Sequence, residues 1–198
     1  MYETSFNKRT SIITKRGRVN LNSKEELHLV KKAMKGNPKA YGNLIHYYQD
    51  YLYKTAFLYV KDEDSALDIV QESILKGYES IRKLKHPQFF KTWITKILIN
   101  NSLTVLKRRN STISIETIED ITKSYLQPML EEKLDLYEAI DNLSEIYKTI
   151  IILKYFNDLK INEISSLMNI PEGSVKAYLY RAKKELKQYL KEDYLYAK

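Results

Sequence analysis

Positive charge is concentrated in one segment near the end of the chain. Residues 174–191 hold six basic side chains and a single acidic one, Glu185. The basic residues are Lys176, Arg181, Lys183, Lys184, Lys187 and Lys191. An arginine can donate two parallel hydrogen bonds to the edge of a guanine, and a lysine can neutralise a backbone phosphate. This segment therefore indicates contact with nucleic acid.

The residues around this segment predict how its basic side chains are presented. Apolar residues recur every three or four positions from Ile161 to Leu179, interrupted by the sequence IPEGS at 170–174. This pattern predicts a helix-turn-helix whose second helix, 172–187, lies in the major groove. The candidate DNA contacts are Ser174, Lys176, Ala177, Tyr178, Tyr180, Arg181 and Lys184. We expect Arg181 to read a guanine; the alternative is an ordinary helical hairpin with a solvated basic face.

A second polar surface is predicted on a helix near residues 66–81. Apolar and small residues form one stripe of this helix. The opposite stripe holds Asp68, Gln71, Glu72, Leu75, Lys76 and Glu79. Charged and amide groups beside an exposed leucine are typical of a helix that docks on another protein. The alternative is a solvated helix face on which Leu75 is incidental.

The composition limits the class of protein. The 198 residues include 33 Lys and Arg against 25 Asp and Glu, a net charge of +8, and no cysteine. The absence of cysteine excludes disulfides and thiolate chemistry and fits a reducing cytoplasm. We recognise no membrane-spanning stretch and no signal peptide, so we expect a cytoplasmic protein. Five glycines and four prolines leave few turns, which favours an all-α fold.

Helical periodicity divides the chain into two small helical domains joined by a flexible linker. We expect a basic flexible tail at 1–22 and four helices in a first domain at 23–109. The helical period is lost at 110–130, where Ser, Thr and acidic residues accumulate, so this segment is predicted to be the linker. The second domain, 131–198, contains the helix-turn-helix.

The sequence contains no recognisable catalytic centre. The acidic cluster at 62–68 lacks the glycine of a calcium loop, and Ser73 stands where such a loop has a bidentate glutamate. Acidic residues at a helix start explain the cluster better. His28, His46 and His86 are isolated from any metal or nucleophile motif. We therefore expect no catalytic residue, no metal, no cofactor and no small-molecule substrate.

Four strings in this sequence resemble the extracytoplasmic-function (ECF) sigma factors, small two-domain subunits of bacterial RNA polymerase that recognise promoters. They are DIVQES at 68–73, FKTWITKILIN at 90–100, KRR at 107–109 and IPEGSVK at 170–176, the last followed by RA at 181–182. Their order and spacing both match. The resemblance implies a protein that binds core RNA polymerase and directs it to specific promoters, with no catalysis of its own.

The resemblance also assigns roles to individual residues. It implies that the protein binds the clamp helices of the largest polymerase subunit and the flap. The clamp helices would contact Asp68, Gln71, Glu72 and Leu75. Residues 80–109 would recognise and melt the −10 element and capture a flipped base. The candidate contacts are Lys85, His86, Phe89, Phe90, Lys91, Asn100, Lys107, Arg108 and Arg109. One of the two phenylalanines would stack on bases while the other packs in the core, and Trp93 is also expected in the core.

Several positions depart from the family pattern. Ala177 and Tyr178 replace a Ser and an Arg that are common there, which changes the −35 bases that can be read. Leu67 and Thr104 replace acidic residues, and Lys160 replaces a Ser or Thr cap. We take these last three as tolerated.

The resemblance leaves some questions open. An anti-sigma factor, often membrane-bound in the family, is an expected partner. The linker would thread through polymerase channels or serve only as a tether. The alternatives for the whole chain are a free-standing helix-turn-helix regulator that does not bind polymerase, and a helical adaptor that binds only protein.

Overall fold

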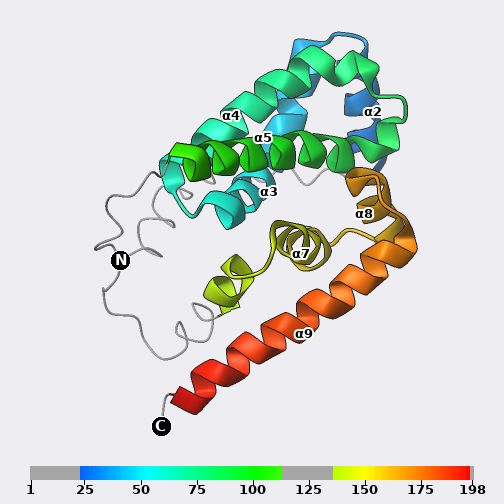
Figure 1. Cartoon of the computed structure of the whole chain (residues 1–198). Helices are drawn as coiled ribbons and strands as arrows, with labels where there is room; N and C mark the ends of the chain where they lie inside the picture. Colours follow the sequence, from blue (N-terminus) through cyan, green and yellow to red (C-terminus); the bar gives the residue numbers. More distant parts are fainter. Residues whose placement is uncertain (1–22, 113–135, 197–198) are drawn as a thin grey trace. The chain divides into compact units, whose positions relative to one another are not determined.

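The computed structural model describes residues 23–112 and 136–196, and the side chains of 23–108 and 136–190. Within these ranges every regular element is a helix (Figure 1). The chain divides into two compact units, Met1–Ile118 and Glu119–Lys198, and each is described by itself. The expected tail at 1–22 and most of the expected linker lie outside the described residues.

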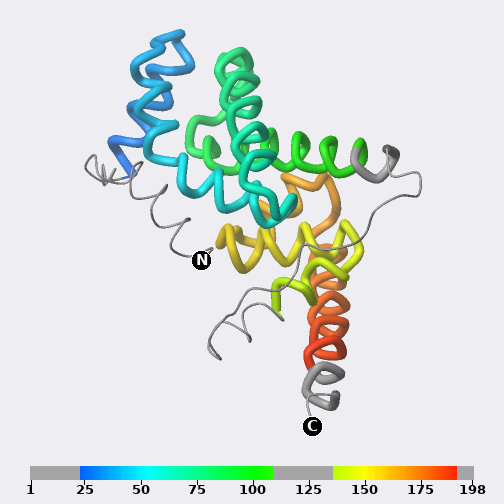
Figure 2. Tube along the Cα trace, turned by 90° about the vertical axis from the view of Figure 1, so that its left-hand side faces the viewer, coloured from blue at the N-terminus to red at the C-terminus, as the bar shows by residue number. Residues whose placement is uncertain are grey.

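The first unit contains the four predicted α-helices and two short 3-10 turns. They are α2 (Ser23–Met34), α3 (Pro38–Val60), α4 (Glu63–Ser80), η1 (Ile81–Lys83), η2 (Pro87–Phe89) and α5 (Phe90–Thr112). Helices α3, α4 and α5 pack against one another, and α2 packs on α3 (Figure 2). Helix α5 continues to Thr112, past the expected boundary at 109, so the linker cannot begin at 110.

Side-chain caps start two of these helices. The Asn37 carboxamide accepts a hydrogen bond from the Ala40 N–H at 2.9 Å, and Pro38 follows it. The Asp62 carboxylate accepts one from the Ser65 N–H at 2.8 Å. Each cap satisfies an amide that has no partner within its helix. The prediction that acidic residues at 62–64 belong to a helix start is confirmed.

The core of the first unit lies where α3, α4 and α5 meet. Leu44 and Leu52 of α3 are fully buried, as are Ile94 and Leu98 of α5. Gly77 of α4 leaves room for the Tyr41 side chain of α3, because a Cβ at position 77 would collide with the Tyr41 hydroxyl. Burial of these apolar side chains provides the main stabilisation of the unit.

The second unit begins with a helical segment at 136–141. It continues through α7 (Glu145–Ile151), the π-helical turn η3 (Ile152–Phe156), α8 (Ile161–Met168) and α9 (Glu172–Tyr196). Helix α8 begins at Ile161, where the apolar repeat of the sequence begins, and α9 begins as predicted but extends beyond the expected end at 187. Helix α9 packs on both α7 and α8.

The turn between α8 and α9 is fixed by local hydrogen bonds. Asn169 adopts the left-handed conformation with φ 55°, and the Ile170 N–H donates to the Ser165 carbonyl at 3.2 Å. The Ser165 hydroxyl in turn donates to the Ile170 carbonyl at 2.6 Å. Beyond the turn, Ile164, Val175 and Ala182 are fully buried, so α9 is held to α8 by an apolar contact. This geometry fixes which face of α9 remains exposed.

Candidate protein and nucleic-acid interfaces

One face of α4 carries the four side chains for which the sequence predicts a role in protein docking. Asp68, Gln71, Glu72 and Leu75 are all exposed, and Leu75 keeps 54% of its area in contact with solvent. We call these four residues the docking ridge. An exposed leucine gains free energy when a partner covers it, and polar neighbours orient that partner.

The docking ridge is linked to the adjacent turn of α4. The Lys76 ammonium lies 3.1 Å from the Glu72 carboxylate, with about half of each side chain exposed (50% and 53%). A pair this exposed contributes little to folding, because water screens both charges. The same ammonium donates a hydrogen bond to the side-chain oxygen of Asn101 at 2.8 Å, so Lys76 connects the ridge with α5.

The two neighbouring phenylalanines have different environments. Phe90 is completely buried, whereas Phe89 is 48% exposed. A ring without solvent access cannot receive a base, so the expected DNA contact at Phe90 is wrong and its role is packing. The Phe90 ring lies 5.7 Å from the Tyr48 ring and 5.9 Å from the half-buried Trp93 ring. Phe89 is the residue of the pair that keeps an accessible ring.

Basic residues lie on both sides of Phe89 in the sequence, in the segment before α5 and in its first turn. Lys85 and His86 are exposed, and the His86 ring is edge-on to Phe89 with 6.1 Å between centroids. Lys91 is half-buried, with its ammonium 4.8 Å from the centre of the Tyr51 ring. A cation over an aromatic face is attracted by the ring electrons, which restricts where Lys91 can reach.

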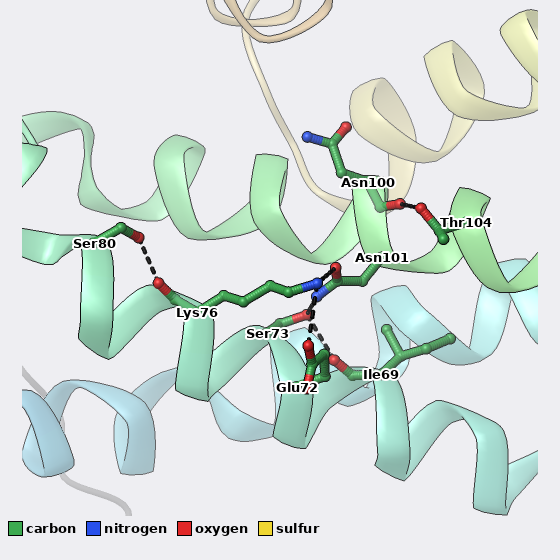
Figure 3. Close-up of polar contacts among 8 residues, drawn as sticks. All are labelled: Ile69, Glu72, Ser73, Lys76, Ser80, Asn100, Asn101 and Thr104. Atoms are coloured by element: carbon green, nitrogen blue, oxygen red, sulfur yellow. Dashed lines mark hydrogen bonds and ion pairs between the residues drawn. The ribbon is translucent and has the colours of Figure 1, made fainter.

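Helix α5 presents Asn100 to solvent and keeps the adjacent Asn101 buried (Figure 3). Lys107 and Arg108 are also exposed, and the side chain of Arg109 lies outside the described residues. No motif in the sequence singles out Asn101. Its position seven residues after Ile94 and three after Leu98, on the buried stripe of α5, is the signal that would have found it.

The first half of α9 exposes most of the predicted DNA contacts. Tyr180 is 71% exposed. The other exposed candidates are Lys176, Ala177, Arg181 and Lys184. Ser174 is half-buried at the start of the helix. Tyr178 differs from the expectation: its half-buried ring packs 5.9 Å from that of Tyr147 on α7, so its base-reading face is partly covered.

The described residues form neither a metal-binding cluster nor a membrane-spanning helix. They include no group of three or more His, Asp or Glu side chains that could hold a metal ion. None of their helices combines the length and the apolar character that a membrane crossing needs.

The described parts define a class of protein. One helical unit exposes an acidic and amide-rich ridge, and the other exposes the basic face of a helix that follows a tight turn. A basic helix presented after a tight turn is typical of helix-turn-helix proteins that bind DNA.

Comparisons with known proteins identify the family. Residues 44–112 match the model of sigma-70 region 2, and residues 133–186 match that of sigma-70 region 4. The chain is 42% identical over 149 residues to the RNA polymerase sigma factor SigV of Bacillus subtilis, covering 73% of this chain and 87% of that one. It is 32% identical over 170 residues to the ECF RNA polymerase sigma-E factor of Haemophilus influenzae, covering 78% and 89%.

Solved structures agree on the fold. CnrH, solved in complex with the cytosolic domain of CnrY, superposes with a TM-score of 0.68 at 17% identity, covering 87% of this chain and 99% of that one. RpoE of Bartonella quintana, solved with the anti-sigma factor NepR, superposes with a TM-score of 0.62 at 21% identity, covering 77% of this chain and 98% of that one.

The chain belongs to the ECF group of sigma-70 family RNA polymerase sigma factors. It is an alternative sigma factor that directs promoter recognition.

Proposed function

We propose that the two units divide promoter recognition between them. The docking ridge on α4 binds the clamp helices of the largest polymerase subunit, and residues 80–109 recognise and melt the −10 element. The exposed face of α9 reads the −35 element. The observation that carries this proposal is the ridge itself, because four adjacent exposed residues include a leucine that a partner would bury.

The −10 assignment rests on a group of exposed residues in the first unit. Phe89 offers an aromatic face for an unpaired base, and Asn100 offers a side-chain amide for hydrogen bonds to a base. Lys85, Lys107 and Arg108 offer charge for the DNA backbone. Unpairing a base costs a few kcal/mol, and stacking together with hydrogen bonds can offset that cost.

The −35 assignment rests on the exposed half of α9. The exposed Arg181 carries the paired donors that a guanine edge accepts, and the exposed Lys176 and Lys184 offer charge for neighbouring phosphates. Tyr180 offers a second exposed group in place of Tyr178. The nucleotidyl transfer itself belongs to the polymerase, so we assign this chain no catalytic group and a place of action in the cytoplasm.

Run-off transcription with purified core polymerase tests the proposal. The full chain and core polymerase are incubated with genomic fragments, and the transcript starts are mapped. We expect starts that require both components and share spaced −35 and −10 sequences. A chain that binds duplex DNA alone and leaves the start sites of core polymerase unchanged would instead be a free-standing helix-turn-helix regulator.

An anti-sigma factor is the second protein partner expected for this chain. CnrH and RpoE were solved in complexes with CnrY and NepR. By analogy, we propose a protein that covers both DNA-binding faces of this chain and that resides in the membrane. Affinity capture with the full chain from soluble and detergent-extracted fractions tests this. The captured protein must inhibit run-off transcription when it is added back, and its absence from both fractions contradicts the proposal.

A further inference from the structure

A buried side-chain amide joins the helix of the docking ridge to the helix that carries Asn100. Asn101 of α5 is only 8% exposed, and its amide nitrogen donates to the Ser73 hydroxyl oxygen on α4 at 2.9 Å. Its amide oxygen accepts from the Lys76 ammonium at 2.8 Å (Figure 3). Asn101 therefore uses both ends of its amide in hydrogen bonds to α4, the nitrogen as a donor and the oxygen as an acceptor.

The α4 side of this link is itself held in place. The Ser73 hydroxyl donates to the Ile69 carbonyl at 2.6 Å, which leaves its lone pairs free to accept from Asn101. Lys76 is paired with Glu72 of the docking ridge at 3.1 Å. The chain of contacts thus runs without a gap from Glu72 through Lys76 to Asn101 (Figure 3).

Other small polar side chains on α5 behave differently. The fully buried Ser102 hydroxyl donates to the Leu98 carbonyl of its own helix at 2.9 Å. The Thr104 hydroxyl donates to the Asn100 carbonyl at 2.7 Å. Bonds of this kind satisfy a hydroxyl but do not join two elements. Ser102 is therefore a natural control, because it is buried beside Asn101 without bonding α4.

A hydrogen bond restrains two helices in a way that apolar contacts do not. Burial of Leu98 and Ile94 against α4 is favourable over a range of helix rotations, because the hydrophobic effect has no direction. A buried hydrogen bond weakens steeply when its distance or angle changes. Because consecutive helical residues are about 100° apart, the restraint on Asn101 also determines where Asn100 points.

We propose that Asn101 is a positioning residue for promoter opening. Through Ser73 and Lys76 it fixes the rotation of α5 relative to the docking ridge, so that Asn100 meets the flipped base when the ridge is bound to polymerase. This inference rests on the proposed roles of the ridge and of Asn100, and extends them to a residue that contacts neither DNA nor polymerase.

The test compares three substitutions in the full chain. Asn101→Leu keeps the number of side-chain heavy atoms and the branch at Cγ and removes both bonds, while Ser73 and Lys76 retain Ile69 and Glu72 as partners. Asn101→Asp keeps an oxygen toward Lys76 and accepts from Ser73 when the Ser73 hydroxyl turns its proton away from the Ile69 carbonyl, so it preserves both links to α4 and is the conservative rescue. Ser102→Ala removes a buried hydroxyl that bonds only its own helix, and it is the matched control.

Three quantities are measured for each variant: the urea midpoint of unfolding, the affinity for core polymerase, and the rate of open-complex formation. Opening is followed by permanganate reactivity of −10 thymines in a promoter recovered by run-off transcription. For Asn101→Leu we expect unchanged core affinity and opening slower by about five- to ten-fold, as the loss of one or two buried hydrogen bonds predicts. Asn101→Asp and Ser102→Ala are expected to open at nearly the wild-type rate.

A double-mutant cycle with Asn100→Ala decides whether Asn101 acts through its neighbour. If it does, Asn101→Leu slows opening very little further in the Asn100→Ala background. If the two substitutions slow opening by independent factors that multiply in the double variant, the inference is overturned. It is also overturned if Asn101→Leu opens the promoter at the same rate as Ser102→Ala. If the wild-type chain fails to bind core polymerase, the proposed function and this inference fall together, whereas normal core binding and opening by Asn101→Leu removes the inference alone.

Discussion

The hydroxyl of Tyr41 on α3 donates a hydrogen bond to the main-chain carbonyl oxygen of Ile74 on α4 at 2.7 Å. The Tyr41 hydroxyl that makes this bond also lies directly against Gly77. A Cβ atom at position 77 would overlap the Tyr41 hydroxyl and come within 2.7 Å of the Ile94 side chain. The close approach of α3, α4 and α5 therefore depends on a glycine that has no steric substitute.

Replacement of two helical glycines should change stability in opposite directions. Gly77→Ala should lower the free energy of unfolding by about 1–3 kcal/mol, because the added methyl group overpacks the contact. Gly42→Ala on α3 should raise it by up to about 1 kcal/mol, because nothing lies within 4 Å of the new methyl and alanine favours the helix. Urea unfolding of both variants measures the difference, and equal effects at the two sites would contradict this packing.

Alkaline pH should destabilise the first unit through two buried tyrosines. Burial raises the pKa of Tyr41 and of Tyr48 well above the usual range, and the hydrogen bond and negative charge of Glu26 raise the pKa of Tyr48 further. Both tyrosines therefore stay protonated in the folded protein at a pH where the unfolded chain has lost those protons. Their contribution to stability is complete below pH ~10 and decreases as the pH rises beyond it.

Each buried tyrosine should lower the free energy of unfolding by at most about 1.4 kcal/mol per pH unit above that value. Urea unfolding between pH 9 and 11 measures the slope. Tyr41→Phe and Tyr48→Phe should each make it shallower, whereas Tyr180→Phe, at an exposed position, should leave it unchanged. A slope that all three variants share would mean that these two tyrosines do not set it.

Periodicity in the sequence predicts the helices well, because apolar side chains face the core of each unit. Helix α8 begins at Ile161, where the apolar repeat of the sequence begins, and the α4 face opposite the predicted polar stripe is buried, as at Ile69 and Ser73. The ends of α5 and α9 are not predicted. The helical period weakens there while the backbone continues to Thr112 and Tyr196, because a helix that is already formed extends at little cost.

The site is harder to predict because its details depend on contacts between distant segments. The sequence narrows the stacking residue to Phe89 or Phe90, but the packing of Phe90 against Tyr48 distinguishes them. The contact of Tyr178 with Tyr147 joins residues of two helices that helical spacing alone does not bring together. Asn101 escapes prediction for a different reason, since it is its neighbour Asn100 that matches the family pattern and the partners of Asn101 lie on α4.

Removal of polar groups from the docking ridge should weaken binding to core polymerase. Asp68→Ala and Gln71→Ala together should reduce that affinity while leaving the urea midpoint unchanged, because both side chains are exposed. Lys54→Ala, an exposed charge on α3, is the control and should have no effect on affinity. Fluorescence anisotropy of the labelled chain with core polymerase measures the difference. Equal affinities for the ridge variant and the control would show that docking occurs elsewhere.

Alanine substitutions at the two adjacent phenylalanines should affect different properties, stability at one position and promoter opening at the other. Phe90→Ala should lower the free energy of unfolding by about 3–5 kcal/mol, because it empties a fully buried site. Phe89→Ala should leave stability within about 0.5 kcal/mol, since its ring is half exposed. If Phe89 stacks on an unpaired base, this second variant should still slow open-complex formation at wild-type core affinity. Normal opening by Phe89→Ala would remove its assignment to the −10 element.

Arginine and lysine on α9 should contribute to DNA binding in distinguishable ways. Arg181→Ala should cost about 1–3 kcal/mol of specific −35 binding and relax base preference at one position, because it would lose a bidentate contact. Lys184→Ala should weaken binding to all sequences alike and reduce the salt dependence by about one counterion, because it contacts phosphate. Run-off transcription from promoters randomised in the −35 element, repeated at several salt concentrations, separates the two effects.

Because both residues are exposed on the same face, neither substitution should move the unfolding midpoint, and a loss of binding can be attributed to the interface. If Arg181→Ala behaves like Lys184→Ala, with unaltered base preference, then the arginine contacts only the backbone and Tyr180 becomes the remaining large exposed side chain with which this helix can read bases.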